Sequence, residues 1–122
     1  MNDNGVLRED GSRYWQVDGK FHRIDGPAYI DSEGSEEWYQ NDKLHRLDGP
    51  AITNAIYRGW WQNGNIHRLD GPAIIYIDGK KFWYTDGLDI SIDVEEWIID
   101  FNINSWEEWT DIQKLLFRMK FQ

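Results

Sequence analysis

Histidine, arginine and aspartate recur together three times in this chain, at a spacing that could support acid–base chemistry. The copies are His22-Arg23-Ile24-Asp25-Gly26-Pro27-Ala28, His45-Arg46-Leu47-Asp48-Gly49-Pro50-Ala51 and His67-Arg68-Leu69-Asp70-Gly71-Pro72-Ala73, and they contain every histidine and every proline of the sequence. A histidine can serve as a general base, an arginine can hold an anion, and a carboxylate can orient the histidine. The motif is therefore the first place to look for a catalytic site.

Repetition of the motif favours a structural role instead. The copies begin 23 and then 22 residues apart, a period typical of repeat architectures in which each unit stacks on its neighbours. An enzyme needs one site, whereas three equivalent copies would do the same packing job three times. We expect each arginine to pair with an aspartate of its own or the adjacent unit, and each histidine to hold a turn carbonyl through a ring N–H. The residues assigned to this repeat motif are His22, Arg23, Asp25, His45, Arg46, Asp48, His67, Arg68 and Asp70.

Other features that could carry chemistry are weak. Equivalent histidines of units stacked along a sheet lie roughly 10 Å apart, which is too far for one metal ion. Glu36-Glu37 on a strand would point to opposite faces, and Glu107-Glu108 falls in the first turn of an expected helix. The sequence contains no phosphate-binding glycine loop, nucleophile elbow or zinc-ligand spacing. We predict no catalytic residues, no metal site and no cofactor, and therefore a protein that is not an enzyme.

The elements that position the motif can be read from its flanks. A tryptophan precedes each histidine by seven residues, and Trp83 continues the series with Ile90 in the histidine position. Between tryptophan and histidine lie Asp-Gly, Asn-Asp or Asn-Gly pairs, which are strong signals for a tight hairpin turn. Together with further turns at Asp10-Gly11, Glu33-Gly34 and Asp78-Gly79, this pattern predicts an antiparallel meander. Strands are expected at 13–17, 28–31, 37–40, 51–54, 60–62, 73–77 and 82–85.

The repeat resembles the MORN family over residues 11–89. Lys20-Phe21-His22 and Lys43-Leu44-His45 match its Lys-x-His step, and Gly26, Gly49 and Gly71 match a following glycine, whereas arginine follows the histidine where a MORN unit usually has glycine. The His-Arg-x-Asp-Gly-Pro-Ala variant is similar to repeats in proteins of large bacteriophages and giant viruses. The resemblance implies an antiparallel sheet of MORN-like hairpins that serves as a scaffold or contact surface, with phosphoinositide binding proposed for some members.

After Asp89 the period becomes helical. Asp93-Val94-Glu95-Glu96 and Ser105-Trp106-Glu107-Glu108 read as capping boxes that open two amphipathic helices within residues 93–121. The apolar stripe expected for the second helix is Trp106, Trp109, Ile112, Leu116 and Met119. The chain is thus predicted to be a single α+β domain over residues 1–122, in which the helices cover one sheet face or cap the end of the array.

Composition narrows the range of partners. The net charge of −9, from 22 acidic and 13 basic residues, disfavours nucleic acid and anionic lipid and favours a basic protein partner or mimicry of a polyanion. The absence of cysteine, of a signal-peptide pattern and of an apolar run long enough to span a membrane favours the cytoplasm, or the host cytoplasm for a viral protein.

The expected contact surface is the column one residue past each repeat tryptophan. Aromatic residues make up 16 % of the chain, and they fall on both faces of the expected strands. We predict a protein-binding face, open also to homodimer formation, made of Gln16, Tyr29, Tyr39, Trp61, Tyr76 and Tyr84. The leading interpretation is a protein–protein interaction module, such as a phage-encoded inhibitor of a host or defence protein. Two alternatives remain: an acidic nucleic-acid mimic acting through Asp31, Glu33, Glu36 and Glu37, and a small-molecule binder or hydrolase that uses the repeat histidines and arginines.

Overall fold

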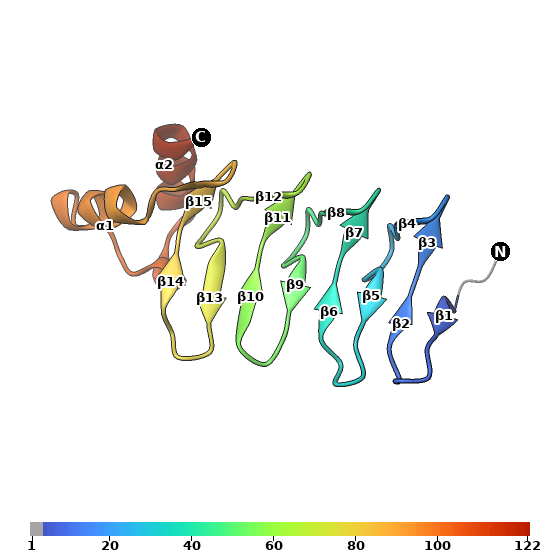
Figure 1. The fold of residues 1–122 in the computed structure, drawn as a ribbon. Coiled ribbons are helices and arrows are strands. Elements are labelled where there is room, and N and C mark those ends of the chain that lie inside the picture. The colour runs from blue at the N-terminus through green and yellow to red at the C-terminus, as the bar shows by residue number, and fades with distance from the viewer. Residues whose placement is uncertain (1–3) are drawn as a thin grey trace.

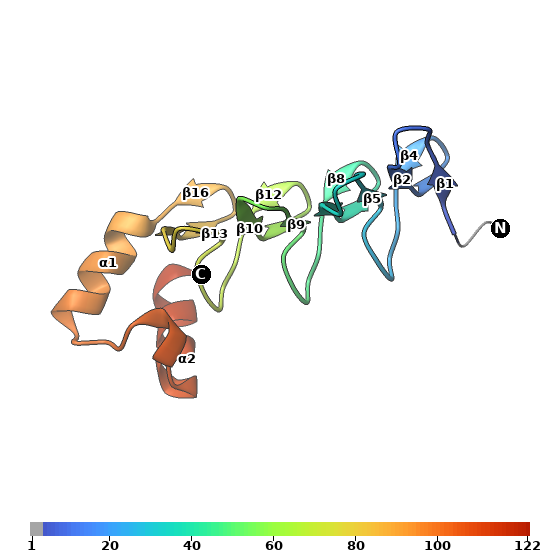
Figure 2. The same cartoon turned by 90° about the horizontal axis from the view of Figure 1, so that it is seen from below.

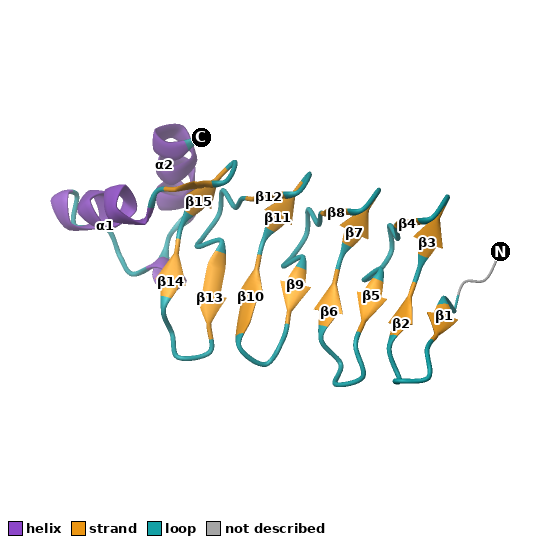
Figure 3. Cartoon of the chain, in the orientation of Figure 1, coloured by secondary structure: helices purple, strands orange, loops and turns teal. Residues whose placement is uncertain are grey.

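A computed structural model describes residues 4–122 and shows an extended row of β units that ends in two helices (Figures 1 and 3). One sheet has eight strands in the order β1-β2-β5-β6-β9-β10-β13-β14, and every neighbouring pair is antiparallel. Four two-stranded hairpins, one per unit, extend from it. The predicted antiparallel meander followed by two helices is therefore confirmed. The strands of the large sheet are β1 (Val6–Leu7), β2 (Arg13–Tyr14), β5 (Tyr29–Ile30), β6 (Glu36–Glu37), β9 (Ile52–Thr53), β10 (Tyr57–Gly59), β13 (Ile74–Tyr76) and β14 (Lys81–Phe82). The hairpins pair β3 (Gln16–Val17) with β4 (Lys20–Phe21), β7 (Tyr39–Gln40) with β8 (Lys43–Leu44), β11 (Trp61–Gln62) with β12 (Asn65–Ile66), and β15 (Tyr84–Thr85) with β16 (Leu88–Asp89).

Each strand expected to run through a repeat tryptophan is instead broken there. The prediction of one strand over residues 13–17 is wrong, because β2 belongs to the large sheet and β3 to a hairpin. The N–H of Trp15 donates to the carbonyl of Ala28 at 2.8 Å, and the carbonyl of Trp15 accepts from the N–H of His22 at 3.1 Å. These bonds join the tryptophan to the two ends of its own motif and bend the chain between the two sheets. The same break occurs at Trp38, Trp60 and Trp83.

The tight turns form as their sequences predict. At Asp18-Gly19 the φ angles are 53° and 78°, so both central residues are in the left-handed region that a type I′ turn requires. The pairs Asn41-Asp42, Asn63-Gly64 and Asp86-Gly87 have the same geometry. Local chemistry therefore sets the hairpin in all four units.

Neighbouring hairpins are joined by one arrangement of backbone bonds that occurs three times. The N–H of Asp42 donates to the carbonyl of Phe21 at 2.9 Å, and the N–H of Arg23 donates to the carbonyl of Tyr39 at 3.0 Å. The equivalent bonds join Gly64 to Leu44, Arg46 to Trp61, Gly87 to Ile66 and Arg68 to Tyr84, at 2.8–3.2 Å. Seen from below, with the row running across the view, the hairpins lie on one side and the loops that carry the motif project on the other (Figure 2).

In the turns that join β5 to β6 and β9 to β10, a side-chain oxygen accepts hydrogen bonds from backbone N–H groups. In the second unit, Oδ1 of Asp31 accepts from the N–H groups of Glu33 and Ser35, each at 2.9 Å. In the third unit, which is one residue shorter, Oδ1 of Asn54 accepts from the N–H groups of Ile56 and Tyr57. A carboxylate and an amide thus fill the same role in different units, as expected of Asx turns.

We predict that acid weakens the turns whose backbone N–H groups bind a carboxylate. The hydrogen bonds from Ser35 and Glu33 hold the pKa of Asp31 below its usual value of 3.8. A lowered pKa in the folded state contributes stability that is complete above the unfolded value and is lost as the pH falls through the folded value. Asp31→Asn should therefore reduce the acid sensitivity of the unfolding midpoint, measured by urea titration between neutral pH and about pH 3. Because Asn54 already serves this way, an Asp31→Asn variant as acid-sensitive as the parent would contradict the assignment.

The helices begin at residues other than those predicted. Helix α1 spans Ser91–Asp100 and starts directly where the fourth motif would stand; the hydroxyl of Ser91 accepts from the N–H of Trp83 at 2.9 Å. The predicted cap at Asp93 is wrong, since Asp93 lies within the first turn. Helix α2 spans Asp111–Phe121 and is capped by Thr110 and Gln113 rather than by Ser105. A short 3₁₀ turn, η1 (Trp106–Glu108), occupies the predicted start of this helix.

The two helices cap the end of the array rather than cover a sheet face (Figures 1 and 2). Together with the last unit they enclose the main apolar cluster. This cluster consists of Trp83, Ile90, Val94, Trp97, Trp109 and Phe117. The predicted stripe of the second helix is wrong at Ile112, Leu116 and Met119, which are exposed, whereas Phe117 is fully buried. Because η1 interrupts the helical phase, the spacing counted from Trp106 does not continue into α2. In residues 4–122 no helix has the length and apolar character needed to cross a membrane.

Candidate interaction surfaces

The motif arginines are stacked on the repeat tryptophans. The guanidinium carbon of Arg23 lies 3.8 Å from the centre of the Trp15 ring, and the Arg46–Trp38 and Arg68–Trp60 distances are both 3.9 Å. Such contacts bring the positive guanidinium onto the negative face of the ring. Each of the three units therefore uses its arginine in the same packing contact.

Each arginine also closes its own loop through two hydrogen bonds. In the second unit, Nε of Arg46 donates to Oδ1 of Asp48 at 2.9 Å, and Nη1 donates to the carbonyl of Pro50 at 3.2 Å. The bond to Arg46 lowers the pKa of Asp48. The first and third units repeat both bonds, so the pairing lies within each unit.

The motif histidines link one unit to the next as acceptors. Nδ1 of His22 accepts from the N–H of Asn41 at 3.1 Å, and Nδ1 of His45 accepts from the N–H of Asn63 at 3.0 Å. His67 accepts from Asp86 in the same way at 2.9 Å. The expectation that a ring N–H holds a turn carbonyl is therefore reversed: the ring must carry its proton on Nε2, and the turn supplies the donor.

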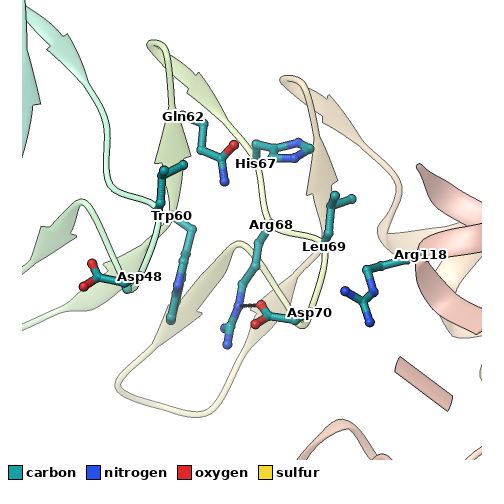
Figure 4. A pocket seen from close by; sticks show the side chains of 10 residues that line it. Asp48, Trp60, Gln62, His67, Arg68, Leu69, Asp70 and Arg118 are labelled. Carbon is teal, nitrogen blue, oxygen red and sulfur yellow. Dashed lines mark hydrogen bonds and ion pairs between the residues drawn. The ribbon is translucent and has the colours of Figure 1, made fainter. Parts of the chain in front are cut away.

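A groove lies between the second and third motif loops beside α2 (Figure 4). It has a volume of about 320 Å³, and its lining includes Asp48, Trp60, His67, Arg68 and Arg118. Its acid–base groups are already used, because His67 accepts from the next turn and Arg68 bonds Asp70 and Pro72. Burial lowers the pKa of Arg68. The side chains that a His-Arg-Asp site would use are thus engaged in hydrogen bonds within the fold.

Rings from the large sheet and the hairpins meet on one face, which we term the aromatic face. Phe21 of β4 lies 5.9 Å from Tyr14, 6.1 Å from Tyr29 and 5.5 Å from Tyr39, measured between ring centres. In the third and fourth units, Tyr76 lies 5.8 Å from Tyr57 and 6.0 Å from Phe82. The aromatic face comprises Tyr14, Phe21, Tyr29, Tyr39, Tyr57, Trp61, Tyr76, Phe82 and Tyr84.

Between the two ring clusters, Trp61 lies over Gly59. A Cβ at residue 59 would come within 2.2 Å of the indole ring, so the absence of a side chain at this position lets the ring lie flat against the backbone. Gly59 stands where Tyr14 stands in the first unit and Phe82 in the fourth. The indole thereby takes the place of the missing ring in the third unit.

The residues predicted to bind a partner lie on or beside this face. Gln16, Tyr39, Trp61 and Tyr84 occupy one repeat position at the start of the hairpins, and Tyr29 and Tyr76 lie in the large sheet. Gln16 is exposed and the other five are half-buried. The face is thus folded partly onto itself at Phe21 and still presents rings to solvent.

One tyrosine on this face has a firmly held hydroxyl. The Tyr39 hydroxyl donates to Oε1 of Glu37 at 2.6 Å. Burial together with this carboxylate raises the pKa of Tyr39 well above its usual value of 10.0. The hydroxyl therefore stays protonated and is a fixed polar group among the rings.

Sequence reasoning misses two groups of surface residues. The first is four rings of the aromatic face: Tyr14, Phe21, Tyr57 and Phe82. Phe21 belongs to the Lys-x-His step, but its position two residues after the Asp18-Gly19 turn is that of a strand residue facing a partner strand. The outer surface of α2, formed by Ile112, Leu115, Leu116 and Met119, was assigned in part to the core. Its signal, apolar residues at i, i+3, i+4 and i+7, was present in the sequence.

We also looked for grouped metal ligands and for similar proteins. In the part of the chain that the structure describes, no three histidine, cysteine, aspartate or glutamate side chains are grouped so as to hold a metal ion. No protein-family model, curated protein or solved structure matches this chain.

Proposed function

We propose that this chain is a non-enzymatic protein-binding module that contacts its partner through the aromatic face. The carrying observation is a contrast between two sets of repeated residues. The histidines and arginines of all three motifs are engaged in identical contacts within and between units. The tyrosines of the aromatic face and Trp61, in contrast, are only half-buried, and such residues supply most of the affinity at protein interfaces.

The charge around this face supports a basic partner. Glu37 and Asp42 lie close enough to Tyr39 to raise its pKa, and Asp89 does the same for Tyr84. The chain as a whole carries −9. Aromatic anchors flanked by carboxylates suit a partner that presents arginine or lysine, because arginine both stacks on rings and pairs with carboxylates.

The contacts favour this reading over the two alternatives. Of the carboxylates that a nucleic-acid mimic would use, Asp31 accepts two backbone N–H groups and Glu37 accepts the Tyr39 hydroxyl. A hydrolase would need a free base, whereas each motif histidine presents its unprotonated nitrogen to a backbone N–H.

The identity of the partner rests on the resemblance of the repeat alone. Because the His-Arg-x-Asp-Gly-Pro-Ala variant is similar to repeats of large bacteriophages, we extend the proposal to an inhibitor of a bacterial host or defence protein in the host cytoplasm. The MORN-like character of the repeat is part of the same proposal.

The proposal predicts that single ring deletions weaken binding. Immobilised wild-type chain should retain a bacterial protein that Tyr39→Ala and Trp61→Ala each release, and titration of that purified protein should give at least a tenfold loss of affinity. Ile24→Ala, at an exposed position of the first motif loop, is the matched control and should bind like wild type. Circular dichroism spectra and unfolding midpoints separate loss of binding from loss of fold. If folded ring variants bind as tightly as wild type, the aromatic face is not the site.

A further inference from the structure

Helix α2 carries a second apolar stripe that nothing in the described chain covers. Ile112, Leu115, Leu116 and Met119 are 71 %, 50 %, 44 % and 73 % exposed. Their spacing of i, i+3, i+4 and i+7 places them on one helix face. Phe117, on the opposite face, is fully buried in the cap. Helix α2 therefore has apolar side chains on two faces, and only the face that contains Phe117 is packed against the rest of the described chain.

The stripe continues into a trough between the two helices. A cavity of about 360 Å³ is lined by Trp97, Phe101, Ile103, Leu116, Met119 and Lys120. Phe101, just after α1, is 68 % exposed, and its ring forms part of this lining. A soluble monomer rarely leaves so many large apolar side chains together on one surface.

The two helices that border the trough have opposite charge. Helix α1 carries Asp93, Glu95, Glu96 and Asp100 and no basic residue, whereas α2 carries Lys114, Arg118 and Lys120 against Asp111. Among residues 4–122, none of these eight side chains takes part in an ion pair within 4.0 Å. Both charges of a complementary pair are thus present on one molecule and left unpaired within it.

We propose that the outer stripe of α2 binds the same stripe of a second copy of this chain. A two-fold axis makes such a contact self-complementary, because the same patch serves on both sides. In the antiparallel arrangement the acidic first turn of each α2, at Asp111, faces the basic last turn of its partner, where Arg118 and Lys120 lie. This arrangement also aligns the two helix dipoles favourably.

The acidic helix α1 favours a second copy as the occupant. Its carboxylates Asp93, Glu96 and Asp100 line a neighbouring pocket that shares Trp97, Phe101 and Lys120 with the trough. The α2 of another copy offers both an apolar stripe for the trough and basic side chains for these carboxylates. The contact lies on the helical cap and is separate from the aromatic face, so each surface can be lost without the other.

Measurement of molar mass tests the proposal directly. The wild-type chain, followed by sedimentation velocity over a concentration series, should shift from monomer to dimer. Ile112→Gln and Met119→Gln should each keep the chain monomeric over the same series. Glutamine keeps helix propensity close to that of the replaced residues, and both positions are largely exposed, so the cap itself should remain folded.

Matched controls separate this contact from general stickiness. Ile24→Gln and Ile77→Gln remove equally exposed apolar side chains from the sheet units and should dimerise like wild type. Tyr39→Ala should also dimerise normally, which distinguishes this interface from the proposed partner site. A wild-type chain that stays monomeric, or a dimer that Ile112→Gln and Met119→Gln leave intact, overturns the proposal.

Discussion

Replacing Phe117 with alanine should cost about 3–5 kcal/mol of unfolding free energy, the usual range for a fully buried phenylalanine. The ring is wholly enclosed in the cap and lies 5.1 Å from the ring of Trp109, 5.0 Å from Phe121 and 6.1 Å from Trp97, measured between centres. Its removal leaves a cavity in the apolar cluster that joins the two helices to the last β unit. Urea unfolding followed by tryptophan fluorescence measures the loss.

Met119→Ala is the control for this substitution. It lies on the same helix, is 73 % exposed, and should change the unfolding free energy of the monomer by less than about 0.5 kcal/mol. Hydrogen exchange adds a spatial readout, because stability in a repeat array is a sum over units and their interfaces. In Phe117→Ala, protection should fall first in α1 and α2 and remain in β5 to β9. Uniform loss along the chain would instead mean that the cap and the array unfold together.

Replacing Arg46 with alanine should cost about 2–3 kcal/mol, from the loss of a partly desolvated cation–π contact and a hydrogen bond to a carbonyl. Arg46 stacks on Trp38 at 3.9 Å and donates to the Pro50 carbonyl in the middle of the array. Without Arg46, the Trp38 ring loses its cation–π contact, and the carboxylate of Asp48 and the carbonyl of Pro50 lose their hydrogen-bond donor. Thermal and urea unfolding both report the change.

Asp48→Asn separates the stack from the ion pair. Asp48 is largely exposed and pairs with Arg46 through one oxygen, which an asparagine can keep as an acceptor. Exposed ion pairs contribute little, so this variant should unfold close to wild type. A loss in Asp48→Asn as large as that in Arg46→Ala would transfer the main role from the ring to the carboxylate.

The parts of the fold set by neighbouring residues could be predicted from the sequence. The Asp18-Gly19 turn and its counterparts need only two residues that tolerate positive φ, so composition was enough to locate them. The period of the motif likewise gave the number and order of the units. The break at Trp15 could not be seen this way, because it depends on a hydrogen bond to Ala28, thirteen positions later in the chain.

The helical end shows the same limit more strongly. Ser105-Trp106-Glu107-Glu108 has the composition of a helix start, but the indole N–H of Trp106 donates to the carbonyl of Asp70, 36 residues earlier. That anchor and the bond from the Trp109 indole to Asn104 hold a short 3₁₀ turn in place of the helix. The phase of α2 therefore follows from Thr110, and Ile112, Leu116 and Met119 of the predicted stripe are exposed rather than buried.

Five residues of the aromatic face could be selected from the sequence, whereas the shape of the face could not. The column of Gln16, Tyr39, Trp61 and Tyr84 followed from counting one position past each tryptophan. Phe21 of hairpin strand β4 contacts rings of the large sheet. This contact forms only because the chain bends between the sheet and the hairpin. Alternation along a straight strand could not show it.

The same hydrogen bonds join each hairpin unit to the next. The number of units can therefore change without a change in these contacts. A duplicated unit of 23 residues would bring its own turn, its own stacked arginine and a histidine whose acceptor nitrogen meets the next turn. It would add two strands to the sheet, or roughly 10 Å of row, while the last unit met the helices unchanged. Selection can therefore match the span of the aromatic face to the size of a partner by copying or deleting whole units, with no new contact to invent.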